Sequence, residues 1–144
     1  HLRPNESVAT RTAKLQSWSG RRQIPTVFVA SIQDSLVGSA MLVAHDMDSR
    51  LQWSPWLGGV VVSPEHRRLG IGASLIKHAA AAERIWFQRF WGGLDESACD
   101  GYSRRDEGTF SVADDESLAD VIAEFERARQ QSREIASRFD LDAT

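Results

Sequence analysis

The sequence has few cysteines, no long apolar run and no large excess of charge of one sign, and each of these absences excludes a class of protein. Among 144 residues there is one cysteine, Cys99, so no disulfide can form within the chain and a reducing compartment is expected. No apolar run approaches the roughly 20 residues that cross a bilayer, and no signal peptide is apparent. The net charge is −3, and positive and negative residues are interspersed, so the charge pattern gives no reason to expect binding to nucleic acid or to a membrane surface. We therefore expect a cytoplasmic protein with neither partner.

The first half of the chain has the composition of a short helix followed by three strands. Helical spacing covers Ala9 to Trp18, and β-branched and apolar residues then form two runs, Thr26 to Ile32 and Leu36 to His45, around the turn "QDS". A third run, Trp56 to Val62, is apolar almost throughout, which is typical of a strand buried on both faces. The chain begins at His1 without a methionine, so we expect residues upstream to be missing.

The second half is helical by pattern. Apolar residues recur at helical spacing from Leu75 to Phe90, which predicts a helix of about five turns. A polar loop follows, in which "GTFSV" (108–112) is the sole short candidate for a strand. A second long helix is then expected to be capped by Asp114 or Asp115 and to end near Phe139. The predicted fold is α/β, with a mainly antiparallel sheet of three or four strands followed by two long helices.

A glycine-containing loop joins the third strand to the first long helix. In "SPEHRRLGIGAS", Arg67, Gly70 and Gly72 follow the apolar strand directly and precede the helix. Glycines allow close approach of the backbone, and the unpaired N–H groups of a first helical turn attract an anion together with the helix dipole. The loop is therefore a candidate phosphate site. The alternative is an ordinary strand-to-helix turn that binds no ligand.

The stretch from about residue 13 to 75 resembles the GNAT superfamily of N-acetyltransferases, whose cofactor motif is Arg or Gln, two residues, Gly, one residue, Gly or Ala. This resemblance implies acetyl-CoA as cofactor and, if the chain is active, acetyl transfer to a small-molecule amine. Backbone groups of the strand would pair with the pantetheine arm and polarise the thioester carbonyl, and the loop would hold the pyrophosphate. The cofactor-binding residues implied are Val60, Val61, Val62, Arg67, Arg68, Leu69, Gly70, Ile71, Gly72 and Ala73.

Direct attack by an amine also needs a proton acceptor. Glu65, His45 and Asp46 are the available side chains near the third strand, and Glu65 is the weak candidate we retain for a catalytic role. Each also has an ordinary structural explanation as a loop, strand-end or turn residue. The superfamily continues with a further strand, a helix that often offers a tyrosine, and a closing hairpin. The single tyrosine here, Tyr102, lies in the polar loop, so catalysis is less secure than cofactor binding.

Residues 74–144 resemble instead the second and third helices of DinB-like four-helix-bundle proteins, which include thiol-dependent transferases and isomerases. The resemblance would make His78 the first of three histidine ligands to a metal. No histidine follows His78 in the sequence, so we expect it to pack or to hydrogen-bond without metal, and ligation is the weak alternative. We interpret the aromatic cluster of Trp86, Phe87, Phe90 and Trp91 as core.

The two resemblances meet within one helix. We hypothesise a fusion of two incomplete domains, 1–73 and 74–144, that share the helix starting near residue 70. Natural recombination, a truncated reading frame and sequence assembly all remain open as its origin. Three functions also remain open: an acetyl-CoA-binding acetyltransferase-like protein, a DinB-like metal or thiol protein, and a non-catalytic globular fragment. The last would form a homodimer that covers the edges of its sheet.

Overall fold

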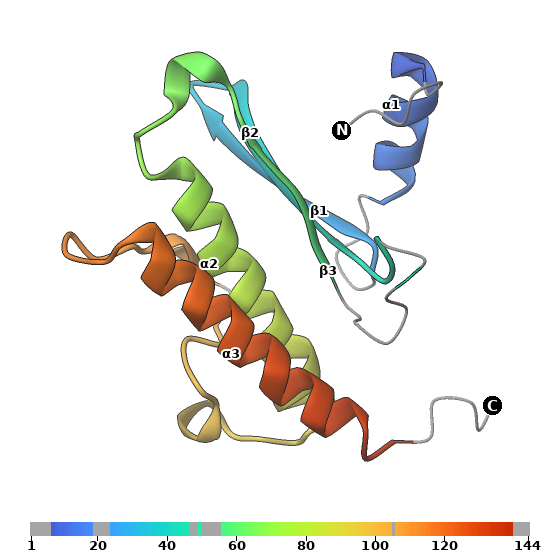
Figure 1. Cartoon of the computed structure of the whole chain (residues 1–144), viewed down its shortest axis with the longest axis vertical. Helices are drawn as coiled ribbons and strands as arrows, with labels where there is room; N and C mark the ends of the chain where they lie inside the picture. The colour runs from blue at the N-terminus through green and yellow to red at the C-terminus, as the bar shows by residue number, and fades with distance from the viewer. Residues whose placement is uncertain (1–6, 19–23, 47–48, 50–55, 105, 140–144) are drawn as a thin grey trace.

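The structure is a computed structural model that describes residues 7–18, 24–46, 49, 56–104 and 106–139. A short helix, three strands and two long helices follow one another, with short 3-10 turns between them (Figure 1). In the described part of the chain, no helix combines the length and the apolar character that a membrane span requires. The elements are α1 (Val8–Ser17), β1 (Thr26–Ile32), β2 (Ser35–Val43), β3 (Trp56–Val62), η2 (Pro64–His66), α2 (Ile71–Glu83), η3 (Arg84–Trp91), η4 (Glu96–Ala98), η5 (Glu107–Phe110) and α3 (Leu118–Ala136).

The three strands form one antiparallel sheet in the order β1-β2-β3. β1 and β2 are joined by a two-residue turn in which Gln33 and Asp34 both have positive φ, the backbone of the tight hairpin turns that suit twisted strands. The predicted hairpin and the α/β fold class are thus confirmed. Helix α1 also forms as expected, and Ser7 caps it by accepting a hydrogen bond from the Thr10 amide.

Strand β3 departs from the sequence prediction. It occupies the predicted residues, but Val60 and Val61 are exposed. The prediction that this strand is buried on both faces is therefore wrong. Within the described residues, β3 lies at the edge of the sheet and has β2 as its strand partner. Its register with β2 shifts between Ser39 and Met41, so Gly59 and Val60 together lie opposite Ala40. Gly59 takes a positive φ of 64° at this bulge.

Helix α2 forms the centre of the molecule. It contacts all three strands, α3 and η5. Small residues allow this close packing: Ala79 and Ala80 are fully buried, and a Cβ atom on Gly38 of β2 would lie 3.3 Å from Leu75. Beyond Glu83 the helix continues as π-helical turns to Trp91. The predicted long helix is thus confirmed, although its last part has the wider turns of a π-helix. Trp91 and Phe90 are exposed, which corrects the interpretation of the aromatic cluster as core.

The start of α3 also differs from the sequence prediction. Ser117, rather than Asp114 or Asp115, is the cap: its side chain accepts from the Asp120 amide while the Asp120 carboxylate accepts from the Ser117 amide. Asp114 and Asp115 lie in the preceding turn. The candidate strand at 108–112 is instead the end of the 3-10 turn η5, followed by extended chain. A strand there would have needed a free sheet edge, whereas η5 lies against α2.

A buried ion-pair network holds α3 and the loop after η3 onto α2. Arg84 is 0% exposed, and its guanidinium donates to Asp100 at 2.8 Å and to Glu124 of α3 at 2.7 Å. Glu124 also accepts from Lys77 at 2.7 Å, and Lys77 in turn donates to Glu116 at 2.8 Å. Burial raises the pKa of Glu124, but the bonds from Lys77 and Arg84 outweigh it and hold that pKa below its usual value.

The first prediction concerns Glu124, which bridges two cations. Glu124→Gln leaves Arg84 buried with one carboxylate instead of two, so we expect the free energy of unfolding to fall by about 2 to 3 kcal/mol. Because the Glu124 pKa lies below that of the unfolded chain, this contribution is present near pH 7 and is lost as the pH falls through the acidic range. Urea unfolding at pH 7.5 and at pH 4 measures both effects.

The matched control is Glu126→Gln, two residues along the same helix. Glu126 is 56% exposed and makes one long contact of 3.4 Å to Arg129. The change should alter the stability by less than about 0.5 kcal/mol. Equal losses for the two variants would contradict the assignment of the network as the main polar tie between α2 and α3.

Candidate functional site

The loop between β3 and α2 leaves a row of backbone donors open. In the part of the chain that the structure describes, the backbone N–H groups from Arg68 to Ala73 donate to no protein acceptor. The first that does is the Ser74 amide, which donates to the Gly70 carbonyl at 3.0 Å. Gly70 occupies the cap position of α2 and offers no side-chain cap. The arrangement is the one expected for an anion-binding helix start.

Glycine at positions 70 and 72 keeps this row accessible. Gly70 has a positive φ of 76°, and Arg68, two residues before it, also has a positive φ of 66°. A Cβ atom on Gly70 would meet nothing within 4 Å, and one on Gly72 would touch only Val62 at 3.8 Å. The space over the first turn is therefore open, and a small group of several atoms can approach the N–H groups.

Basic side chains stand beside the row of donors. Arg67 and Arg68 are both exposed, and the Arg67 Nε donates to the Val62 carbonyl at 3.2 Å, which ties the loop to the end of β3. His66 lies in η2, where its Nδ1 is 2.8 Å from the Ser63 hydroxyl. The loop thus combines fixed backbone donors with nearby positive charge, a combination that favours phosphate.

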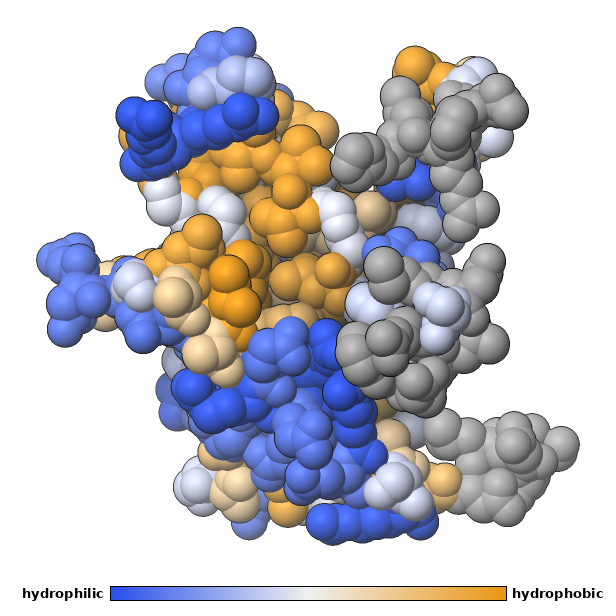
Figure 2. All heavy atoms as spheres, viewed as in Figure 1, coloured by the Kyte–Doolittle hydropathy of each residue, from blue (hydrophilic) through white to orange (hydrophobic). Residues whose placement is uncertain are grey.

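The edge strand of the described sheet, β3, leads into this loop. Figure 2 shows apolar side chains gathered beside the sheet and the first turns of α2 and α3. Val60 and Val61 are exposed on β3, and Val62 is half-buried at the point where the strand ends. A ligand with a phosphate at the loop and a strand-like arm could follow this edge and hydrogen-bond with the backbone near Val60 and Val61.

The three proton-acceptor candidates lie at different ends of β3. Asp46 is beside the strand's beginning: a Cβ atom on Gly58 would lie 3.9 Å from its carboxyl carbon. Gly58 directly precedes the bulged Gly59, so this carboxyl is close to the bulge. Glu65 lies instead in η2, beyond the far end of the strand, and is exposed. His45 precedes Asp46 and is also exposed.

His78 lies elsewhere, on the side of α2 that faces η5. Its ring stacks on Phe110 and meets Phe28 edge-on, each at a centroid distance of 4.5 Å, and its Nδ1 is 2.9 Å from the Thr109 hydroxyl. Burial lowers the pKa of His78, so the imidazole is neutral near pH 7. Among the residues the structure describes, no three His, Cys, Asp or Glu side chains could hold a metal. These residues do not fit a three-histidine centre.

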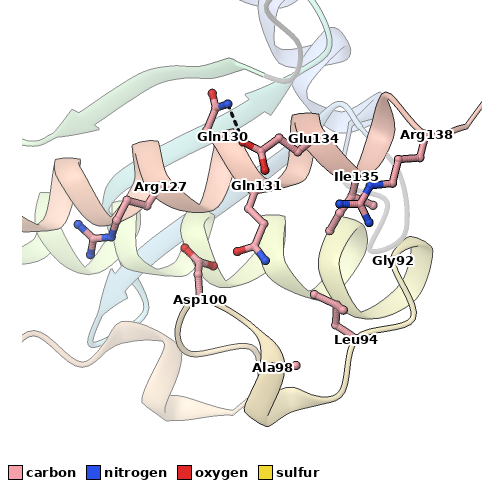
Figure 3. Close-up of a pocket in the computed structure, with 10 residues that line it drawn as sticks. All are labelled: Gly92, Leu94, Ala98, Asp100, Arg127, Gln130, Gln131, Glu134, Ile135 and Arg138. Atoms are coloured by element: carbon pink, nitrogen blue, oxygen red, sulfur yellow. Dashed lines mark hydrogen bonds between the residues drawn. The ribbon is translucent and has the colours of Figure 1, made fainter.

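A hollow of about 520 Å³ lies between the end of α3 and the loop after η3 (Figure 3). Arg127 and Arg138 lie towards its two ends, and Gln130 donates to Glu134 at 3.0 Å on its rim. None of the residues predicted from the sequence lines it. The sequence-predicted site and this hollow are therefore separate features.

Two family models match the chain. The acetyltransferase (GNAT) domain model matches residues 23–104, and the mycothiol-S-transferase model, a DinB-like family, matches residues 68–144. Each model covers more than half of the chain. The chain belongs to both families. No curated protein and no solved structure matches it.

The two matches overlap over residues 68–104. This range begins within the loop between β3 and α2 and contains α2, η3 and the loop that follows. The chain therefore consists of two overlapping partial domains, as the pair of resemblances predicts. The GNAT match contains β1, β2, β3 and the open loop, and the mycothiol-S-transferase match contains the helical pair.

A buried carboxyl on α2 escaped the sequence reasoning. Glu83 is 1% exposed, and neither of its carboxyl oxygens has a hydrogen-bond partner. Ser132 of α3 lies nearby but donates to the Ala128 carbonyl at 2.9 Å. Burial raises the pKa of Glu83 to about 7, although Arg129 and Arg133 of α3 oppose the shift. In the sequence, Glu83 looks like an ordinary helical glutamate, and only its position after four alanines indicates a buried face.

Glu83 makes the stability of the fold depend on pH in a definite direction. Its pKa is higher in the folded chain, so below the unfolded value of 4.5 both states are protonated and the group contributes nothing. As the pH rises to about 7, the folded state loses up to about 3 kcal/mol relative to a neutral side chain. We expect Glu83→Gln to be more stable than the wild type at pH 8 and equally stable at pH 4.5.

Urea unfolding of both proteins at several pH values between these limits measures the difference. Glu134→Gln, an exposed position on α3, is the control and should show no comparable dependence on pH. A Glu83→Gln variant that is less stable at pH 8 would show that the carboxylate is well paired in the folded chain.

Proposed function

We propose that the chain binds acetyl-CoA along β3 and at the start of α2, and that it acts, if active, as an acetyltransferase towards a small-molecule amine. The observation that carries this proposal is the row of open N–H groups from Arg68 to Ala73, at the loop of a GNAT-family match. These residues fit a diphosphate, since the donors are fixed and the glycines leave the space above them open.

Each part of the site has a distinct role in this proposal. The loop amides and the arginines at 67 and 68 hold the pyrophosphate, while the backbone of Val60 to Val62 pairs with the pantetheine arm. Acetyl-CoA supplies the thioester whose acetyl group is transferred to the amine. A backbone N–H at the β3 bulge would polarise the carbonyl without rearrangement, because a strand fixes its position before the reaction.

Asp46 is the side chain we favour as proton acceptor. It lies beside Gly58 and the bulge, whereas Glu65 is beyond the opposite end of the strand. The incoming amine would lose a proton as its nitrogen bonds to the carbonyl carbon, and a carboxylate near the bulge could accept that proton directly or through one water. The C–S bond of the thioester would break in the same transfer, so CoA would leave as a thiolate and take up a proton to become the free thiol. Glu65, by contrast, lies nearer to the phosphate loop than to the proposed position of the acyl group.

The match to the mycothiol-S-transferase model covers the helical pair. His78 is held between two phenylalanine rings and Thr109, and the described residues around it do not fit a metal centre. The helices instead support the phosphate loop, because α2 is anchored by α3 along its length. We therefore assign the acetyl-CoA site as the functional centre.

Isothermal titration with acetyl-CoA and with CoA tests the proposal. Saturable binding is expected for the wild type, and Gly72→Glu should reduce the affinity at least ~100-fold, because a carboxylate would occupy the anion site and repel the phosphates. Gly72→Ala is the matched control: its Cβ atom would make an ordinary 3.8 Å contact with Val62, so binding should remain within about threefold.

No binding by a wild-type chain that circular dichroism shows to be folded would refute the acetyl-CoA site. Binding that survives Gly72→Glu would place the cofactor elsewhere.

A further inference from the structure

We propose that the hollow between α3 and the loop after η3 binds a free amino acid with an apolar side chain. Its volume of about 520 Å³ is in the range of small-molecule sites. The ten residues that line it include a carboxylate, side-chain donors and apolar groups (Figure 3). An amino acid carries the complementary set: an ammonium, a carboxylate and an apolar side chain. The proposal does not depend on acetyl-CoA, because the hollow and the β3–α2 loop are separate features of the described chain.

A buried glutamine holds the loop wall of the hollow in place. Gln88 of η3 is 0% exposed, and its Nε2 donates to the Asp100 Oδ1 at 2.7 Å while its Oε1 accepts from the Asp100 amide at 3.2 Å. The Gln88 backbone carbonyl also accepts from the Leu94 amide at 3.0 Å. One residue thus fixes both the carboxylate and an apolar side of this wall. A ligand meets them already in position, so binding costs little ordering of the protein.

Asp100 offers a ligand a negative charge. It belongs to an ion-pair network of two cations and three carboxylates, which are Lys77, Arg84, Glu116, Glu124 and Asp100 itself. One negative charge is therefore in excess, and Asp100 is the member of the network that lines the hollow. Its Oδ1 accepts from the Arg84 Nε at 2.8 Å, whereas its Oδ2 lies 3.5 Å from the Arg84 Nη2. Oδ2 can thus accept a hydrogen bond from an ammonium in the hollow.

The helix wall supplies donors for a carboxylate. Arg127 and Gln131 are four residues apart on α3, so their side chains lie on one face of the helix, about 6 Å apart at Cβ. Figure 3 shows the Gln131 amide and the Asp100 carboxylate pointing into the hollow from opposite walls, with Arg127 towards one end. The ammonium and the carboxylate of an amino acid are attached to one carbon. An ammonium at Asp100 therefore brings the carboxylate to these two donors.

The other end of the hollow is apolar. Leu94, Ala98 and Ile135 line it, and Ile135 is buried. A Cβ atom on Gly92 would lie 3.0 Å from the Ile135 Cδ1, so glycine at this position lets the loop approach α3 and close this end. An apolar side chain of the ligand would leave water as it covers these groups, which favours binding. Leucine has a side chain of this kind.

Titration of isotope-labelled protein with L-leucine to about 10 mM tests the site by NMR. We expect saturable shifts of the amides of residues 94–100 and 127–135. Two probes each lack one charge of leucine: isocaproate has no ammonium, and isoamylamine has no carboxylate. Each should bind at least ~10-fold more weakly than L-leucine. The probe without the ammonium replaces a variant of Asp100, because that residue also holds Arg84.

Arg127→Gln should weaken the binding of L-leucine at least ~10-fold, and Arg127 is exposed, so the fold should be unaffected. Arg68→Gln is the matched control: it removes the same charge from the β3–α2 loop and should bind L-leucine like the wild type. A folded wild type that shows no saturable shift would overturn the proposal, and so would equal affinity for isocaproate. Loss of binding in Arg68→Gln alone, with shifts confined to residues 68–73, would place the amino acid at the phosphate loop and refute the hollow as its site.

Discussion

The packing of α2 against three partners is the constraint on which the rest of the structure depends. The described sheet has three strands, and α2 packs against all of them. Ala79 and Ala80 of α2 are fully buried. Its remaining sides are covered by α3 and by η5. Alanines allow this because they bring neighbouring backbones close and lose no side-chain entropy on burial. A larger residue at these positions would separate the sheet from α3, and the core formed by Leu42, Ile76, Val121 and Phe125 would lose its contacts.

Burial of α2 on three sides also forces charged residues into the interior. Over about two turns, α2 and the start of η3 carry Lys77, Glu83 and Arg84, and these three side chains differ in their partners. Arg84 and Lys77 receive carboxylates from α3 and the loop, and the Gly101 backbone lies so close that a Cβ atom there would be 2.6 Å from the Arg84 Cζ. Glu83 receives no hydrogen bond. The same interface therefore holds one satisfied network and one carboxyl that is stable chiefly in its neutral form.

Local patterns in the sequence predicted most elements, and long-range contacts explain the rest. Strands and helices followed from composition and periodicity, and the open loop followed from Gly70 and Gly72, because these features are local. The exposure of β3 could not be predicted, since an apolar strand looks the same whether a neighbour covers it or not. The Arg84 network joins residues 16 and 40 positions apart, and no spacing in the sequence marks such pairs. Asp46 approaches Gly58 only because β2 and β3 pair in this register.

The contrast between the starts of α2 and α3 explains how one helix can belong to two families. Helix α3 begins with Ser117 and Asp120, which satisfy its first amides within the chain and leave little for a ligand. Helix α2 begins with Gly70, which offers no side-chain cap, so its first amides remain open. Both family matches include this helix. Its first turn borders the open loop, whereas Lys77 and Arg84, further along, pair with Glu124 of α3. Because the open amides and the contacts with α3 lie on different turns, one helix carries both features.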